Sequence, residues 1–161
     1  MFGFLFHNHN KREEVHRVLH GRVNRAQARS ITAANMRGPT RGSFTEVVWV
    51  VPCESPAKAD FTKVFPALTR DLSTQGISIV HNAPITDPCV IIGLKDETDR
   101  RFLACTPKHC TSLGYGFHHI GMLCEAVLHI DREDFNSMLE AMLKFEVTAE
   151  SAEVCPLKVV G

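Results

Sequence analysis

The chain has 161 residues, of which 44% are hydrophobic and 22% charged, a composition typical of one packed globular domain. Its formal net charge is zero, so no overall charge attracts it to nucleic acid or to a membrane surface. The charge is unevenly distributed, because residues 11–41 hold eight basic side chains against two acidic ones, whereas residues 131–153 hold seven acidic against two basic.

The six cysteines form no CxxC pair, and most lie in apolar runs, which favours reduced, buried thiols. The apolar stretch at residues 1–6 is far too short for a signal peptide. No run approaches the roughly 20 apolar residues of a membrane-spanning helix. We therefore expect a cytoplasmic protein in a reducing compartment.

Residues 10–30 are predicted to form a helix, because their apolar positions recur at helical spacing. Asn10 is expected to cap this helix, with Glu13 in the capping-box position. Residues 31–43 lose the helical period and contain glycine and proline, which predicts a loop.

The following 80 residues are rich in β-branched and aromatic side chains and are divided by turn signals. The predicted strands are residues 44–51, 64–70, 77–81, 89–94, 101–110 and 115–125. Pro52 is expected to end the first strand, and Pro66 to mark an edge or a bend in the second. Residues 53–63 are expected to form an enlarged hairpin loop. Short strands at this density favour a closed or nearly closed antiparallel barrel over a parallel sheet.

A second helix is predicted at residues 131–146, with Asp131 as its N-cap and two further acidic residues in its first turn. Its apolar stripe contains two phenylalanines, two methionines and a leucine. Such a stripe could contact a partner, but we expect it to pack on the barrel of the same chain. Residues 147–161 are weakly patterned and are expected to form a tail.

The polar segment Asp-Leu-Ser-Thr-Gln-Gly at residues 71–76 lies between two predicted strands. Asp71 and Ser73 alternate, so in extended backbone their side chains share one face. A carboxylate with a hydroxyl beside it suits the hydrogen-bond donors of a guanine base edge. Gly76 would supply either a positive φ or room for close approach. The alternative is a tight turn in which Asp71 and Ser73 bond only their own backbone.

Two arginine pairs have the spacing RxxxR. Arg25 and Arg29 lie within the predicted first helix, where we expect them to point to solvent. Arg37 and Arg41 lie in the loop before the first strand, where they could fold over a ligand and offer forked donors to phosphate or guanine. The alternative for this second pair is a solvated loop.

An RxxxR loop before the first barrel strand, followed by a DxSxxG turn that leads into the third, resembles the PilZ domain family. The matching residues are Arg37, Arg41, Asp71, Ser73 and Gly76. The resemblance extends over residues 37–125, and a helix follows, as in many family members. The segment between the two motifs is long for the family.

The resemblance implies a mainly β fold, namely a six-stranded antiparallel PilZ-like β-barrel with an N-terminal helix and a C-terminal helix, in a bacterial protein. It divides the chain into a helical extension at residues 1–36, the barrel with its C-terminal helix at 37–146, and a tail at 147–161.

The function implied by the resemblance is that of a non-enzymatic receptor for the second messenger cyclic di-GMP. Arg37 and Arg41 would wrap the ligand by contacting guanine and phosphate, while Asp71 and Ser73 would bind a guanine edge. Arg70 adjoins the turn and could add a phosphate contact. Binding would change the conformation of the arginine loop and signal through contact with an effector protein that the sequence does not identify.

Other functions remain open at this point. A PilZ-like adaptor could contact proteins without binding a nucleotide. The basic helix at residues 10–30 could bind a protein, a second copy of the chain or nucleic acid, although it lacks the interleaved aromatic residues that stack on single strands.

A metal site and a cysteine hydrolase are less favoured, and we expect no cofactor beyond the ligand. No spacing of histidine and cysteine matches a zinc module, and His118 and His119 are neighbours that would face opposite sides of a strand. His109 and Cys110 are adjacent in the same way, and no elbow motif surrounds a cysteine or serine nucleophile.

Overall fold

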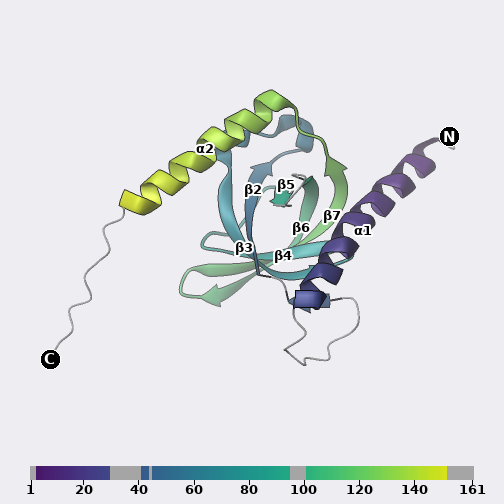
Figure 1. Cartoon of the computed structure of the whole chain (residues 1–161), viewed down its shortest axis with the longest axis horizontal. Coiled ribbons are helices and arrows are strands. Elements are labelled where there is room, and N and C mark those ends of the chain that lie inside the picture. The colour runs from purple at the N-terminus through teal and green to yellow at the C-terminus, as the bar shows by residue number, and fades with distance from the viewer. Residues whose placement is uncertain (1–2, 30–40, 44, 95–100, 152–161) are drawn as a thin grey trace.

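The computed structural model describes residues 3–29, 41–43, 45–94 and 101–151. Within these residues, six antiparallel strands close into a barrel that lies between two helices (Figure 1). The main elements in chain order are α1 (Gly3–Arg29), β1 (Arg41–Ser43), β2 (Val47–Cys53), β3 (Phe65–Ser73), β4 (Gly76–His81), β5 (Cys89–Leu94), β6 (Arg101–Gly114), β7 (Phe117–Leu128) and α2 (Arg132–Ser151). The predicted fold, a mainly β barrel with one helix at each end of the chain, is confirmed.

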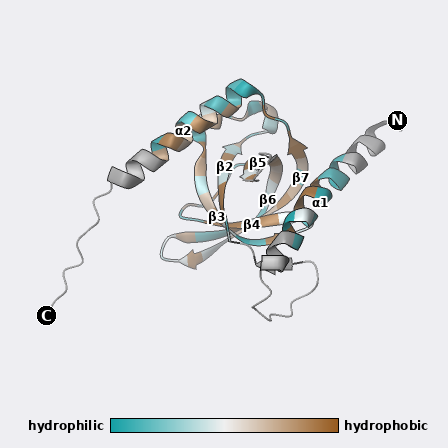
Figure 2. Ribbon diagram, in the orientation of Figure 1, coloured by the Kyte–Doolittle hydropathy of each residue, from teal (hydrophilic) through white to brown (hydrophobic). Residues whose placement is uncertain are grey.

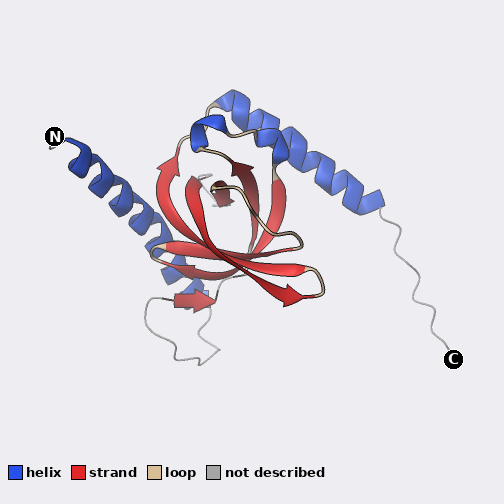
Figure 3. Cartoon of the chain, turned by 180° about the vertical axis from the view of Figure 1, so that it is seen from behind, coloured by secondary structure: helices blue, strands red, loops and turns tan. Residues whose placement is uncertain are grey.

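The barrel strands are hydrogen-bonded in the order β3-β2-β5-β6-β7-β4, and β4 pairs with β3 to close the ring. All of these pairings are antiparallel. The short β1 pairs with the last residues of β3 and adds a seventh strand beside the ring. Figure 3 shows the closed ring from behind, with one helix on each side of it.

Aliphatic side chains from every barrel strand fill its interior, and Figure 2 shows hydrophobic residues along these strands. Four residues of α1 belong to the same buried cluster: Val15, Val18, Leu19 and Val23. Leu19 is completely buried. Burying one such side chain stabilises a fold by about 1.5–3 kcal/mol, so α1 is held to the barrel by apolar contact.

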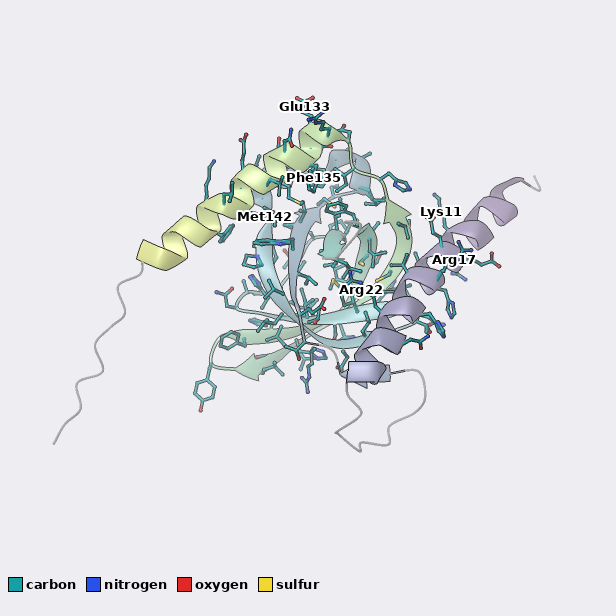
Figure 4. The ribbon with its side chains drawn as sticks, viewed as in Figure 1. Lys11, Arg17, Arg22, Glu133, Phe135 and Met142 are labelled. Atoms are coloured by element: carbon teal, nitrogen blue, oxygen red, sulfur yellow. The ribbon has the colours of Figure 1, made fainter. Side chains whose placement is uncertain are left out.

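An ion pair also fastens α1 to the barrel. The Arg22 guanidinium is buried, and its Nη1 lies 3.1 Å from Oε2 of Glu46, just before β2 (Figure 4). Glu46 is bonded in turn to Thr69 of β3, whose N–H donates to the Glu46 carbonyl over 2.9 Å. Lys11 and Arg17 are exposed, so Arg22 differs from its basic neighbours on α1.

The second helix packs on the outside of the barrel. Met138 and Ala141 of α2 are buried in a cluster with Phe61 and Val64, and Phe135 and Met142 pack against it (Figure 4). Residues 53–63 contain two short 3-10 helices, η1 (Pro56–Lys58) and η2 (Phe61–Lys63), of which η2 contacts α2 and η1 contacts β5. The predicted packing of the α2 stripe on the barrel is therefore confirmed for this part of the helix.

Several predicted boundaries are wrong. Residues 41–43 of the predicted loop form β1, β2 begins at Val47, and α2 continues to Ser151 into the predicted tail. Helix α1 begins at Gly3, so Asn10 lies inside the helix and does not cap it, because residues 4–9 contain neither proline nor glycine to stop it. The apolar stripe of α2 does not pack on the barrel along its whole length, because Phe145, its last residue, is 43% exposed. Strand β6 continues to Gly114, so the last two strands form a longer hairpin than the sequence predicts.

Pro52 lies inside β2 and does not end it. The pairing of β2 with β3 stops at Val50, and Pro52 lies opposite Val90 of β5. A proline is tolerated there because one side of the strand needs no N–H donor. Pro66 lies at the start of β3, before the pairing with β4 begins at Leu68, which agrees with the expected edge position.

The turn between β6 and β7 consists of Tyr115 and Gly116, with φ angles of 53° and 81°. These positive angles are those of a two-residue type I′ hairpin turn. The side chain of Tyr115 is fully exposed, and Leu113 and Phe117 beside it are about half exposed. No helix in the described ranges is both long and apolar enough to cross a membrane.

Candidate ligand-binding site

A β-bulge near the end of β3 turns Asp71 toward the outer surface of the barrel. Thr69 and Leu72 are buried, whereas Arg70 is exposed and Asp71 is half-buried. The register shifts between Thr69 and Asp71, and such an extra residue breaks the alternation of a strand. Ser73 then lies two residues beyond Asp71, and both line one surface pocket, as the alternation predicts.

The hydroxyl of Ser73 organises the turn into β4. Its Oγ accepts hydrogen bonds from the N–H groups of Gln75 at 3.3 Å and Gly76 at 3.1 Å. The hydroxyl also lies 3.2 Å from the carbonyl oxygen of Gly76, to which it can donate. The turn-forming alternative for Ser73 is thus realised, and a ligand that bonds Ser73 has to share or displace these contacts.

The carboxylate of Asp71 has two polar neighbours. Its Oδ2 accepts a hydrogen bond of 3.4 Å from the Ser78 hydroxyl, and Nε of Arg70 lies 4.0 Å away. The Asp71 N–H donates to the same Ser78 Oγ over 3.1 Å. Ser78 therefore holds the carboxylate in place from β4, and the exposed Arg70 contributes a weak surface attraction.

Gly76 provides room for close approach. A Cβ atom at this position would overlap the carbonyl oxygen of Met122 in β7. Among the described glycines, positive φ angles occur at Gly114 and Gly116, so Gly76 is not needed for a left-handed turn. The glycine lets β4 lie against β7 directly after the turn.

The two motif arginines differ in what the structure describes. Arg37 lies outside the described residues. Arg41 is the first residue of β1, and its backbone lies directly opposite Ser73, while Ser43 lies opposite Asp71. Strand β1 therefore brings the backbone that follows the RxxxR loop to the edge of the DxSxxG segment. The other pair, Arg25 and Arg29, lies in α1, and the structure does not describe those two side chains.

A pocket of about 230 Å³ lies on this surface and extends across β3, β4, β7 and β6. Its lining residues include Asp71, Ser73, Ser78, Lys108, His109, His119 and Gly121. The sequence analysis missed the contribution of β6 and β7, because it depends on which residues lie opposite each other in neighbouring strands. A glycine inside an apolar strand, Gly121, was the one available signal of close approach.

The histidines and cysteines form pairs. The rings of His109 and His119 lie edge to face with centroids 5.5 Å apart, and Sγ of the exposed Cys110 lies 3.9 Å from Nδ1 of His118. In the part of the chain that the structure describes, no three histidine, cysteine or acidic side chains are grouped so that they could hold a metal ion.

Two further cysteine pairs lie across neighbouring strands. Sγ of Cys105 lies 3.1 Å from Sγ of Cys124, and Cys53 lies opposite Cys89. Burial raises the pKa of the Cys105 thiol well above its usual range, with a further contribution from Cys124. Burial and the hydrogen bond with Cys89 raise the pKa of Cys53 to about 12. The Cys53 and Cys105 thiols are therefore protonated at neutral pH and are poor nucleophiles.

The sequence matches no protein-family model and no curated protein. Among solved structures, the inhibitor of motility (MotI/DgrA) of Bacillus subtilis matches with 12% sequence identity and a TM-score of 0.37. The match covers 71% of this chain and 52% of that one, so this chain matches about half the length of its structural neighbour. We infer neither fold nor ligand from so remote a similarity.

Proposed function

We propose that the chain is a PilZ-like receptor for cyclic di-GMP, without enzymatic activity. The observation that carries this proposal is the register of β1. The strand that begins with Arg41 lies against Ser73 and Asp71, so the last residue of the arginine motif lies beside the DxSxxG segment, about 30 residues away in sequence, at one edge of a surface pocket.

In this proposal, different residues contact different parts of the ligand. The Asp71 carboxylate accepts from the donors of a guanine edge, with the Ser73 hydroxyl beside it. Arg37 and Arg41 supply forked donors to phosphate and to guanine O6 and N7. Gly76 has no side chain and so lets β4 lie close to β7 beneath the ligand. Arg70, which is exposed next to Asp71, adds a phosphate contact.

Ligand binding would change the conformation of the arginine loop and so change the surface beside β1. In this proposal, an effector protein in the cytoplasm of a bacterial cell recognises the changed surface. The tip of the β6–β7 hairpin offers one surface for such a contact, because Leu113, Tyr115 and Phe117 expose apolar area there. An adaptor that uses this tip without binding a nucleotide is the second candidate function.

Isothermal titration calorimetry with single-residue variants tests the site. Arg41→Ala and Asp71→Asn should each weaken binding of cyclic di-GMP, because each removes a charged partner of the ligand. The loss of one charge-assisted hydrogen bond costs roughly 1.5–3 kcal/mol, which is roughly 10- to 150-fold in Kd. Arg132→Ala is the matched control, because Arg132 is exposed on α2 and lines no part of the pocket.

Equal affinities for the wild type, both site variants and the control would reject the assignment of the site. A wild-type protein that binds no cyclic di-GMP would reject the receptor function itself and leave the protein-binding adaptor as the better account. Circular dichroism of each variant before titration shows that a lost signal does not reflect unfolding.

A further inference from the structure

One row of residues crosses four strands of the pocket floor. Asp71 of β3 lies opposite Ser78 of β4, Ser78 lies opposite Gly121 of β7, and Gly121 lies opposite His109 of β6. Directly opposite residues in antiparallel strands point their side chains to the same face of the sheet. The row therefore places a carboxylate at one end and an imidazole at the other, with a small hydroxyl and a glycine between them.

The glycine in the middle of the row makes room for the histidine at its end. A Cβ at Gly121 would overlap the imidazole ring of His109, so that ring lies over the glycine. Neighbouring strands lie about 4.8 Å apart, so the row from Asp71 to His109 covers roughly 14 Å of sheet. A ligand that fills it has to present different chemistry to its two ends.

A second β-bulge shapes the far end of the row. The register shifts between Pro107 and His109, and the consecutive residues Lys108 and His109 both line the pocket. The bulge between Thr69 and Asp71 acts in the same way on the opposite side. Bulges next to binding sites commonly redirect side chains, and here one lies on each side of the same pocket.

The charges at the two ends of the pocket are opposite. Asp71 is the one acidic residue among the described residues that line it. On the β6 side, the Lys108 ammonium, the His109 imidazole and the neighbouring His119 ring supply donors for an anion. An anionic group of a ligand is attracted to this end and repelled from the Asp71 end.

We propose that Lys108 and His109, with His119 beside them, form a phosphate-binding wall on the β6 side of the pocket. The wall takes a phosphate of the ligand whose base edge meets Asp71, and so it selects nucleotides over nucleosides. The identity of the ligand rests on the function proposed above. The wall itself rests on the register, the second bulge and the charges of the pocket.

Two titrations test the wall separately from the receptor function. In the first, calorimetry measures cyclic di-GMP binding to the wild type, Lys108→Gln, Lys108→Arg and the control Lys58→Gln, an exposed lysine on η1 that does not line the pocket. Lys108→Gln should weaken binding roughly tenfold or more, because a charge-assisted contact is lost. Lys108→Arg and Lys58→Gln should stay within about threefold of the wild type.

In the second titration, inorganic pyrophosphate is added while NMR follows the ring signals of the histidines, assigned with His109→Gln. The signals of His109 and His119 should shift in the wild type and shift much less in Lys108→Gln. If cyclic di-GMP fails to bind but pyrophosphate gives this pattern, the receptor function is wrong and the wall stands. If Lys108→Gln binds cyclic di-GMP as the wild type does, or pyrophosphate leaves both rings unmoved, the wall is wrong whatever the ligand.

Discussion

Gly76 is tightly constrained by its neighbours in the barrel. Gly76 has no space for a side chain, because the Met122 carbonyl oxygen occupies the position of a Cβ. Gly76→Ala should therefore lower the free energy of unfolding by about 1–3 kcal/mol, the usual cost of inserting a methyl group into packed structure. Urea unfolding followed by circular dichroism measures it.

A second glycine provides the matched control. Gly21 lies inside α1, and nothing lies within 4 Å of a Cβ built on it. Gly21→Ala should raise the free energy of unfolding by up to about 1 kcal/mol, because alanine is the better helix former. If both substitutions changed the free energy of unfolding equally, the close approach of β7 would not be the reason that a glycine is needed at position 76.

The thiols should differ widely in their reaction with iodoacetamide. Cys110 is exposed on the β6–β7 hairpin, whereas Cys105 and Cys124 are buried against each other, and burial raises the pKa of Cys105. At pH 7.5 the native protein should be alkylated much faster at Cys110 than at either buried residue. Peptide mass spectrometry at timed intervals measures each rate, and rapid alkylation of Cys105 would contradict the packing of the barrel interior.

The raised pKa of Cys53 gives a pH dependence with a definite sign. The folded state keeps this proton up to about pH 12, whereas the unfolded chain loses it above its ordinary value of 9.0. The free energy of unfolding should therefore fall between pH 9 and 12, because the unfolded state there binds fewer protons than the folded state. The free energy of unfolding, measured with urea, should fall less steeply with pH in this range in Cys53→Ala.

At the scale of the elements, α2 should contribute stability through one side only. Met138 is 2% exposed between α2 and the barrel, whereas Leu143, five residues later, is 59% exposed. Met138→Ala should cost about 2–5 kcal/mol of unfolding free energy, and Leu143→Ala should change it by less than about 0.5 kcal/mol. A similar loss for both would mean that the exposed end of α2 is also packed in solution.

The positions of the strands followed from local patterns in the sequence. Strand β5 lies at the predicted residues 89–94, because a continuous apolar run between turn signals has few other solutions. The start of α1 was not predictable from capping residues, because Asn10 is a residue type that often caps helices but here lies inside a longer helix. Pro52 was similarly misleading, because whether a proline ends a strand depends on which neighbour needs its N–H.

Only part of the site could be predicted from the sequence, for a related reason. Asp71, Ser73 and Gly76 lie within six residues, and their local spacing was enough to bring them together. Lys108 and His109 lie more than 30 residues farther along, and they reach the pocket through the register of three strand pairs and a bulge. Register over such distances is set by the packing of the whole barrel, which no local pattern records.

At the scale of the molecule, one chain of contacts links α1 to the site. The Arg22–Glu46 ion pair ends on Thr69, two residues before Asp71. A ligand that binds the folded state and not the unfolded chain should therefore stabilise helix and barrel together. At about 100 times its Kd, such a ligand adds roughly 2.7 kcal/mol, which should raise Tm by several degrees. Thermal unfolding measured by circular dichroism should show one transition that moves upward in the wild type and clearly less far in Asp71→Asn at the same ligand concentration.

The most direct test of the central claim is a calorimetric titration of the wild-type chain with cyclic di-GMP and, separately, with cyclic di-AMP. The two ligands share their phosphate ring and differ in the base edge that Asp71 is proposed to bind. We predict micromolar or tighter binding of cyclic di-GMP and at least about tenfold weaker binding of cyclic di-AMP, because adenine lacks the paired donors of guanine. No heat with cyclic di-GMP, or equal affinity for both ligands, would contradict the account.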